Sequence, residues 1–156
     1  MTVGIQQLMW EIERIHDAFD RAVHVDGDLD AALALLTEDA TLIHLPAGTG
    51  GAGPDLRRHL AQDVLGHLPA DFAVKRISRT TDKVRVVDEN VVTFTHDREL
   101  AWLLPGVVPT HRRAEVLAIS VTAFRHARVN AHRTESRLCA RRTLWDQQGL
   151  AAQLGL

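Results

Sequence analysis

Nine histidines and one carboxylate near the C-terminus are the residues of this 156-residue chain best suited to acid/base chemistry. Asp146 directly follows Leu144 and Trp145, and a carboxylate in apolar surroundings has a raised pKa that suits a general base. The alternative is that Asp146 caps a short helix over residues 147–154, which the spacing by itself favours. The local pattern leaves both roles open.

Residues 91–102 are expected to form a strand, and alternation places six of its side chains on one face: Val92, Phe94, His96, Arg98, Leu100 and Trp102. Aromatic residues beside a His and an Arg suit a pocket for an apolar ligand that carries one or two polar groups. The alternative is that His96 and Arg98 lie at the margin of the sheet and have structural roles.

Other patterns that carry chemistry are weak. No His-Glu-x-x-His motif or closely spaced His/Cys pair occurs, so we expect no metal site. The Gly-rich run 48–53 lacks the Lys-Ser/Thr pair of a phosphate loop, and we expect it to form a loop at a turn or pocket mouth. No serine stands in a Gly-x-Ser-x-Gly motif, and nothing near Cys139 suggests a lowered thiol pKa. We therefore expect no cofactor and no covalent catalysis.

Composition predicts one compact domain over residues 1–156. The chain is 46% hydrophobic and 24% charged, and at this length a single core buries roughly 70% of the surface exposed by the unfolded chain. The single Cys139 excludes an intrachain disulfide and favours a reducing compartment. No stretch approaches the roughly 20 apolar residues of a membrane span, and the N-terminal segment is acidic. We expect a cytoplasmic protein that does not contact membranes.

Charge is divided unevenly along the chain. Residues 1–100 hold 10 Arg and Lys against 17 Asp and Glu, whereas residues 101–156 hold 8 Arg against 3 acidic residues. A basic segment can bind nucleic acid, but no aromatic residues interleave with these arginines as in single-strand binders. We expect the two parts to face each other within the fold or across an oligomer interface, and we expect no nucleic-acid partner.

The order of predicted elements indicates the fold class. Apolar residues at helical spacing predict three helices, over residues 4–25, 29–37 and 54–66. Alternating and β-branched segments predict strands at 41–45, 72–80, 84–87, 91–102 and 113–125 and between 129 and 146, with a turn at 88–90. Helices followed by long antiparallel strands predict an α+β fold. In this fold a curved antiparallel or mixed sheet forms a cone around three N-terminal helices, and its open end is a pocket.

Four motifs make the chain resemble a known family. Trp145 to Gly155 resembles the closing W-D-x-Q-G-x-x-x-Q-L-G pattern of the SnoaL-like group in the nuclear-transport-factor-2-like superfamily. Pro105 to Arg113 resembles the P-G-x-x-P-T-x-R-R connection of that group, and segments 44–50 and 95–99 are similar to one of its branches. The resemblance covers essentially the whole chain. The group contains polyketide and ester cyclases and many actinobacterial proteins.

This resemblance implies a cone or barrel of curved sheet closed by helices, a homodimer, and an enzyme without cofactor. In the cyclases an Asp at the matching position removes a proton from a carbon next to a carbonyl, so the resemblance makes Asp146 the expected base. Proton shuttling is expected from His44, His96 and His132. Substrate contacts are expected from Phe94, Arg98, Trp102, Arg112 and Trp145. Related isomerases and epoxide hydrolases use a Tyr donor, and because this chain has no Tyr, its donors must be His and Arg.

Two functions are consistent with these features. The leading expectation is acid/base catalysis by a cyclase, isomerase or hydrolase on an apolar metabolite that bears a carbonyl or an epoxide. The alternative is a non-catalytic dimeric module that binds a hydrophobic small molecule. A buried Asp146 that points into a pocket beside a second titratable group favours the enzyme, whereas an exposed Asp146 that caps the tail favours the binding module.

The last strand is expected to be irregular. Arg133-Thr134 recurs as Arg142-Thr143 nine residues later, and an odd separation places the two copies on opposite faces of an unbroken strand. In the related cyclases this segment is shorter, so the chain carries an insertion here. We predict a bulge or local loop between residues 135 and 141 that restores the pairing.

Overall fold

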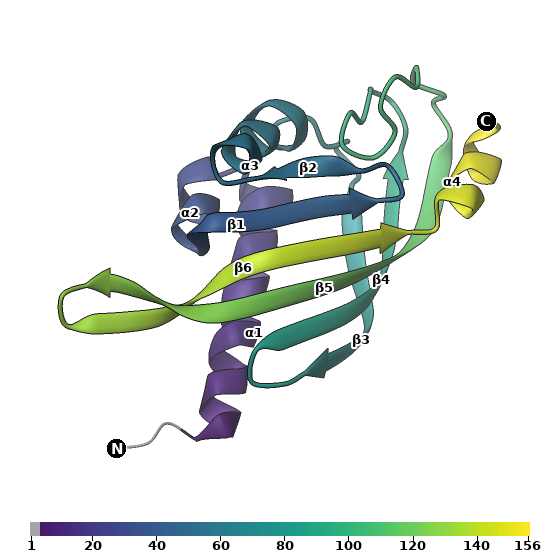
Figure 1. The fold of residues 1–156 in the computed structure, drawn as a ribbon. Helices are drawn as coiled ribbons and strands as arrows, with labels where there is room; N and C mark the ends of the chain where they lie inside the picture. Colours follow the sequence, from purple (N-terminus) through teal and green to yellow (C-terminus); the bar gives the residue numbers. More distant parts are fainter. Residues whose placement is uncertain (1–3) are drawn as a thin grey trace.

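Helix α1 (Ile5–Arg21) lies against one face of a curved six-stranded sheet in the computed structural model, which describes residues 4–156 (Figure 1). Its apolar residues Ile12, Ile15 and Phe19 recur at helical spacing, and all three are buried. The helix continues as a π-helical turn, η1 (Ala22–Asp26), which ends at Gly27 in the left-handed conformation. The predicted helix over residues 4–25 is confirmed.

Two shorter helices follow. Helix α2 (Leu29–Ala34) begins at Asp28, whose carboxylate accepts a hydrogen bond from the Ala31 N–H at 3.1 Å. It ends earlier than predicted because the chain from Leu36 onward pairs in strand β1. Helix α3 (Pro54–His59) starts at Pro54 and continues as π-helical η2 (Leu60–Val64), close to the predicted bounds.

The sheet has the strand order β2-β1-β6-β5-β4-β3. Its strands are β1 (Leu36–Leu45), β2 (Thr49–Ala52), β3 (Ala73–Thr81), β4 (Arg85–Thr95), β5 (Arg113–Asn130) and β6 (Arg133–Trp145). Strands β1 and β6 pair in parallel and the other neighbours are antiparallel, so the sheet is mixed. The predicted α+β fold, with a curved sheet around N-terminal helices, is confirmed. Within residues 4–156 the edge strands β2 and β3 do not pair with each other, so the sheet is not a closed barrel.

Three segments differ from the sequence prediction. The strand expected over residues 91–102 ends at Thr95 as part of β4, so residues 96–102 lie outside the sheet. Residues 88–90 lie inside β4, where Asp88 is buried opposite Arg79 of β3 instead of forming a turn. The Gly-rich run 48–53 contains β2 and not only a loop, because glycine allows an unusually close approach to β1. A Cβ atom at Gly50, whose φ is 136°, would lie 2.0 Å from the carbonyl oxygen of Leu42.

Strands β5 and β6 extend past the sheet as a long hairpin that projects from one side of the molecule (Figure 1). The register between the two strands slips at Cys139, which is the extra residue of a bulge in β6. Buried side chains accordingly lie at even positions before the bulge, such as Ser136, and at odd positions after it, such as Arg141. The predicted irregularity between residues 135 and 141 is confirmed.

The oppositely charged parts of the chain face each other within the fold. Arg141 in β6 binds Asp20 in α1, and Arg125 in β5 binds Asp39 in β1. These pairs agree with the interpretation of the uneven charge as an internal contact.

No helix of the described residues is both long enough and apolar enough to cross a membrane.

Candidate functional site

An enclosed pocket lies between α1, η1 and the inner face of the sheet, with a volume of about 60 Å³. Its wall is mainly apolar and contains four aromatic rings, those of Phe19, Phe72, Trp102 and Trp145. Seven polar side chains also reach it: Asp20, His24, His44, Asn90, Ser120, Arg141 and Thr143. A cavity of this volume has room for about five water-sized groups. It therefore accommodates only a small part of a metabolite.

A wider groove leads from this pocket toward the edge strand β3. It has a volume of about 540 Å³ and is bounded by the end of α1, by η1 and by strands β3 and β4. The pocket and the groove share five lining residues: Asp20, His24, Phe72, Val74 and Asn90. Sites for small molecules usually measure about 300–1,000 Å³. A whole metabolite thus needs both compartments, with its smaller end inside the pocket.

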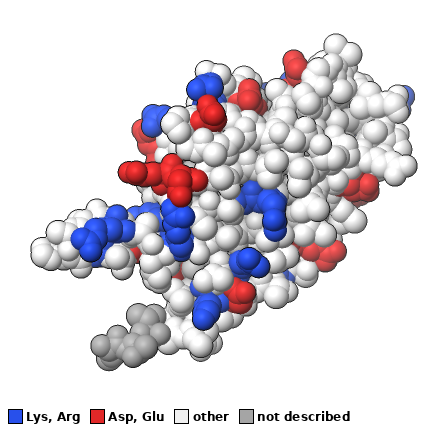
Figure 2. All heavy atoms as spheres, viewed as in Figure 1, with Lys and Arg blue, Asp and Glu red and all other residues white. Residues whose placement is uncertain are grey.

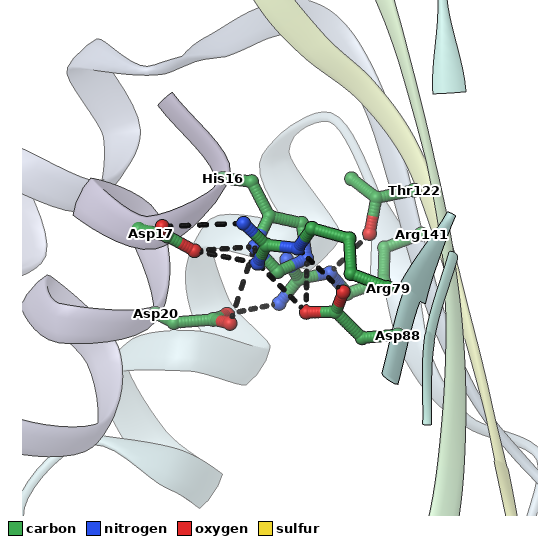
Figure 3. A network of polar contacts seen from close by, with 7 residues as sticks. All are labelled: His16, Asp17, Asp20, Arg79, Asp88, Thr122 and Arg141. Atoms are coloured by element: carbon green, nitrogen blue, oxygen red, sulfur yellow. Dashed lines mark hydrogen bonds and ion pairs between the residues drawn. The ribbon is translucent and has the colours of Figure 1, made fainter. Parts of the chain in front are cut away.

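Arg141 places a nearly buried cation in the pocket wall (Figure 3). Its side chain is 7% exposed; Nε donates to Thr122 Oγ1 at 2.9 Å and Nη1 donates to Asp20 Oδ1 at 2.5 Å. The guanidinium also lies 5.1 Å from the centre of the Phe19 ring. Its Nη2 is buried without a hydrogen-bond partner in the described part of the chain. This free N–H can therefore donate to an oxygen atom of a bound molecule.

A network of charged side chains joins α1 to strands β3 and β4 behind this pocket (Figure 3). His16 is fully buried at its centre, with Nδ1 3.6 Å from Asp20 Oδ2 and Nε2 3.5 Å from Asp88 Oδ2. Arg79 binds Asp88 and Asp17 at 2.7 Å each. The network thereby holds the end of α1 against the sheet, at the border between pocket and groove.

Asp20 is the member of this network that reaches both compartments. Burial alone would raise the pKa of its carboxyl, but the charges of Arg141 and His16 outweigh burial and hold the pKa below its usual range. Asp20 is therefore ionised at neutral pH and neutralises Arg141.

Among residues 4–156, no three His, Cys, Asp or Glu side chains are grouped as a metal ion would require.

His24 stands at the junction of pocket and groove, on the turn that follows α1. Burial lowers the pKa of its imidazole, so the ring is neutral at pH 7. The ring centre lies 5.4 Å from that of Phe72, which steadies its orientation. A neutral imidazole that faces both compartments can accept a proton from a molecule that spans them.

His44 of β1 lies among the tryptophan rings of the pocket. Its Nδ1 accepts the indole N–H of Trp145 at 3.2 Å, and because an indole nitrogen can only donate, the ring proton of His44 is on Nε2. Burial and the nearby charges of His59 and Arg141 lower the pKa of His44 to about 3. His44 is therefore a neutral hydrogen-bond donor at physiological pH.

The structure brings three of the residues expected from sequence to the pocket: His44, Trp102 and Trp145. Phe94 is fully buried one layer behind, with its ring 6.2 Å from that of Phe72. His96 is also fully buried outside the pocket, where its Nδ1 accepts the Thr110 N–H at 3.2 Å and anchors the connection to β5.

Asp146 lies outside both compartments. It is exposed, and its Oδ1 accepts the Gly149 N–H at 3.0 Å, which caps helix α4 (Gln147–Leu154). The helix-capping alternative is confirmed, and the expected buried base is not found at this position. The correction follows from the end of β6 at Trp145, one residue before the chain turns into α4.

His132, Arg98 and Arg112 also lie outside the pocket and the groove. His132 is exposed in the turn of the β5–β6 hairpin, because both strands continue past the core. Arg98 pairs with Asp97 at 3.0 Å, because β4 ends at Thr95 and does not carry residue 98 onto the inner face. Arg112 is exposed near Gly155 at the C-terminus.

Sequence patterns alone do not single out Asp20, His24 or Arg141. One available signal is the four-residue spacing of Asp20 and His24 at the end of the first predicted helix, which places them on one side. Another is the alternation of Arg141 with Thr143 and Trp145, which puts an Arg on the inner face of the last strand.

No protein-family model and no curated protein matches the chain. Solved structures do: a protein from Jannaschia sp. CCS1 assigned as a SnoaL-like polyketide cyclase superposes with a TM-score of 0.68 at 15% identity, over 99% of this chain and 95% of that chain. TsrD from Streptomyces laurentii superposes with a TM-score of 0.66 at 15% identity, over 94% of this chain and 96% of that chain. An LEH-like epoxide hydrolase of M. tuberculosis superposes with a TM-score of 0.62 at 17% identity, over 96% of this chain and 90% of that chain. The fold is thus that of SnoaL-like and ketosteroid isomerase-like proteins.

Proposed function

We propose that this protein of SnoaL-like fold is a cofactor-independent enzyme that removes a proton from a carbon next to the carbonyl group of an apolar metabolite. The observation that carries the proposal is the pairing, in one apolar pocket, of the neutral imidazole of His24 with the unpartnered, buried Nη2 of Arg141. The first can accept a proton, and the second can donate to the oxygen on which negative charge develops.

The reaction begins with transfer of the carbon-bound proton to His24. The electrons of the broken C–H bond move toward the carbonyl oxygen, and the resulting enolate oxygen accepts hydrogen bonds from Arg141 and from the Nε2–H of His44. In a β,γ-unsaturated carbonyl compound the enolate is conjugated, and return of the proton from His24 to its far carbon shifts the double bond and gives isomerisation. Attack of the enolate on a second carbonyl gives cyclisation, and the new alkoxide takes the proton back from His24. With an epoxide, His24 takes a proton from a water molecule while the water oxygen attacks a ring carbon; the ring C–O bond breaks, and the resulting alkoxide takes the proton from His24, which completes hydrolysis.

Deuterium exchange into simple ketones tests the proton-transfer step. A panel of apolar ketones is incubated with the protein in D₂O, and NMR follows deuteration next to the carbonyl. We expect catalysed exchange by the wild type and a loss of about 100-fold or more in His24→Asn, because a positioned base contributes about 10²–10⁴-fold. His67→Asn, which changes an exposed His outside the pocket, is the matched control. Exchange by His24→Asn at the wild-type rate would exclude His24 as the base.

A second candidate function is non-catalytic binding of a hydrophobic small molecule. The exposed, helix-capping position of Asp146 favours it, because the carboxylate expected to act as base is outside the pocket. Mass spectrometry of the purified protein tests this candidate. A metabolite that copurifies, is recovered unchanged after incubation and shows no exchange in D₂O would support the binding module over the enzyme.

We further propose that the protein forms a homodimer through the outer face of the sheet. Ile119 of β5 lies directly opposite Leu144 of β6, and these two residues and Leu117 are 43–48% exposed. The surface around α4, beside this end of the two strands, carries few charged side chains (Figure 2). Exposed apolar side chains grouped on one face are typical of a protein contact surface.

A further inference from the structure

The groove outside the pocket contains a cation without a counter-ion. Arg76 of β3 lies directly opposite Asn90 of β4, and opposed residues of antiparallel strands share a face, so both side chains line the groove. The two other arginines of the groove are paired, Arg79 with two carboxylates and Arg21 with Asp26. Within residues 4–156 Arg76 forms no ion pair, so the groove has a positive charge to offer to a ligand.

The surroundings of Arg76 favour a singly charged anion. Its planar guanidinium and the neighbouring Asn90 amide present N–H donors that match the two oxygens of a carboxylate. Three carboxylates, those of Asp17, Asp20 and Asp88, also line the groove. They repel a dianion such as a phosphate monoester about twice as strongly as a monoanion, because Coulomb energy scales with charge.

We infer that Arg76 binds the carboxylate of an amphipathic substrate whose apolar end occupies the enclosed pocket. The inference rests on the proposed function, in which His24 at the junction takes a proton from a carbon next to a carbonyl group, and it narrows the substrate class to apolar keto acids. The pocket of about 60 Å³ takes a small apolar end, and the groove of about 540 Å³ holds the rest of the chain or ring. The carboxylate remains near water, which avoids the cost of burying a charge.

Decanoate and 1-decanol test the inference, because they have the same chain length and differ in charge. Binding is followed by the fluorescence of the tryptophans that line the pocket. We expect Arg76→Gln to weaken decanoate binding about fivefold, the effect of one partly exposed ion pair, and to leave 1-decanol binding unchanged. Lys75→Gln is the matched control. Lys75 is exposed and precedes Arg76 in β3, and because successive side chains of a strand point to opposite faces, Lys75 lies on the face away from the groove. It should leave the binding of both compounds unchanged.

Three results would overturn the inference. Equal decanoate affinities for wild type and Arg76→Gln exclude a role for Arg76, and failure of both compounds to bind the wild type excludes the two-compartment site. Tighter binding of decyl phosphate than of decanoate shows a site for dianions instead. Absence of deuterium exchange, together with decanoate binding that depends on Arg76, would reject the proposed catalysis and leave the carboxylate site intact.

Discussion

Replacement of Arg141 by Met tests the buried charge pair on which the site depends. Met is of similar length but carries no charge, so Asp20 loses its cation. Breaking a fully buried pair costs about 3–5 kcal/mol and breaking an exposed one about 0–1 kcal/mol. The side chains of Arg141 and Asp20 are 7% and 31% exposed, so we expect about 2–3 kcal/mol. Loss of the hydrogen bond to Thr122 adds about 1 kcal/mol.

Equilibrium unfolding in guanidinium chloride at pH 7 measures this change. A loss of about 3–4 kcal/mol lowers the midpoint by about 0.8–1 M if the slope is about 4 kcal/mol per M, as is usual for small proteins. Arg142→Met is the matched control, because Arg142 is the next residue and is exposed on the outer face. Its free energy of unfolding should stay within about 0.5 kcal/mol of the wild type.

The pH dependence of the free energy of unfolding gives an independent check on the direction of this effect. Because the pKa of Asp20 is lowered in the folded wild type, its stabilising contribution is present above the ordinary value of 3.8 and is lost as the pH falls through the folded-state pKa. In Arg141→Met, the Asp20 carboxyl stays buried without the charge of Arg141, which raises that pKa, and acid neutralises the carboxylate. The difference between wild type and variant should therefore be largest at pH 7 and shrink toward pH 4. A loss under about 1 kcal/mol at pH 7, or a difference that grows in acid, would refute the reasoning.

Three further perturbations probe the cap, a buried imidazole and the outer face. Asp146→Ala should lower the free energy of unfolding by about 1 kcal/mol through the lost cap of α4, with ketone exchange unchanged; lost exchange in the folded variant would restore Asp146 as a catalytic candidate. Below pH 6.5 the unfolded chain protonates His44 and the folded chain, with a His44 pKa of about 3, does not, so stability falls by up to about 1.4 kcal/mol per pH unit. His44→Phe should flatten this slope, and equal slopes in the two proteins would contradict it. Ile119→Lys should convert a dimer to a monomer in light scattering, and a monomeric wild type would disprove the dimer.

Part of the candidate site could be predicted from local pattern. His44, Trp102 and Trp145 reach the pocket because each is a bulky side chain in a segment that the sequence marks as largely apolar. His132 does not reach the pocket, because it lies in the turn of a hairpin that extends past the core. The length of that hairpin depends on how far both strands continue to pair, which the sequence of one strand does not show. The triplet 88–90 resembles a turn in sequence, yet Asp88 lies inside a strand because Arg79 binds its carboxylate there.

The sequence by itself determined the features that depend on interactions between residues close together in the chain. The amphipathic first helix, the change of strand parity before Arg141 and the α+β order of elements depend on neighbours within a few residues. The candidate site depends on residues far apart: Asp20 and Arg141 are separated by 121 positions and meet only because α1 packs against β6. Periodicity shows which face of an element is buried but not which element covers it, so only the tertiary structure decided where the charges of this site come together.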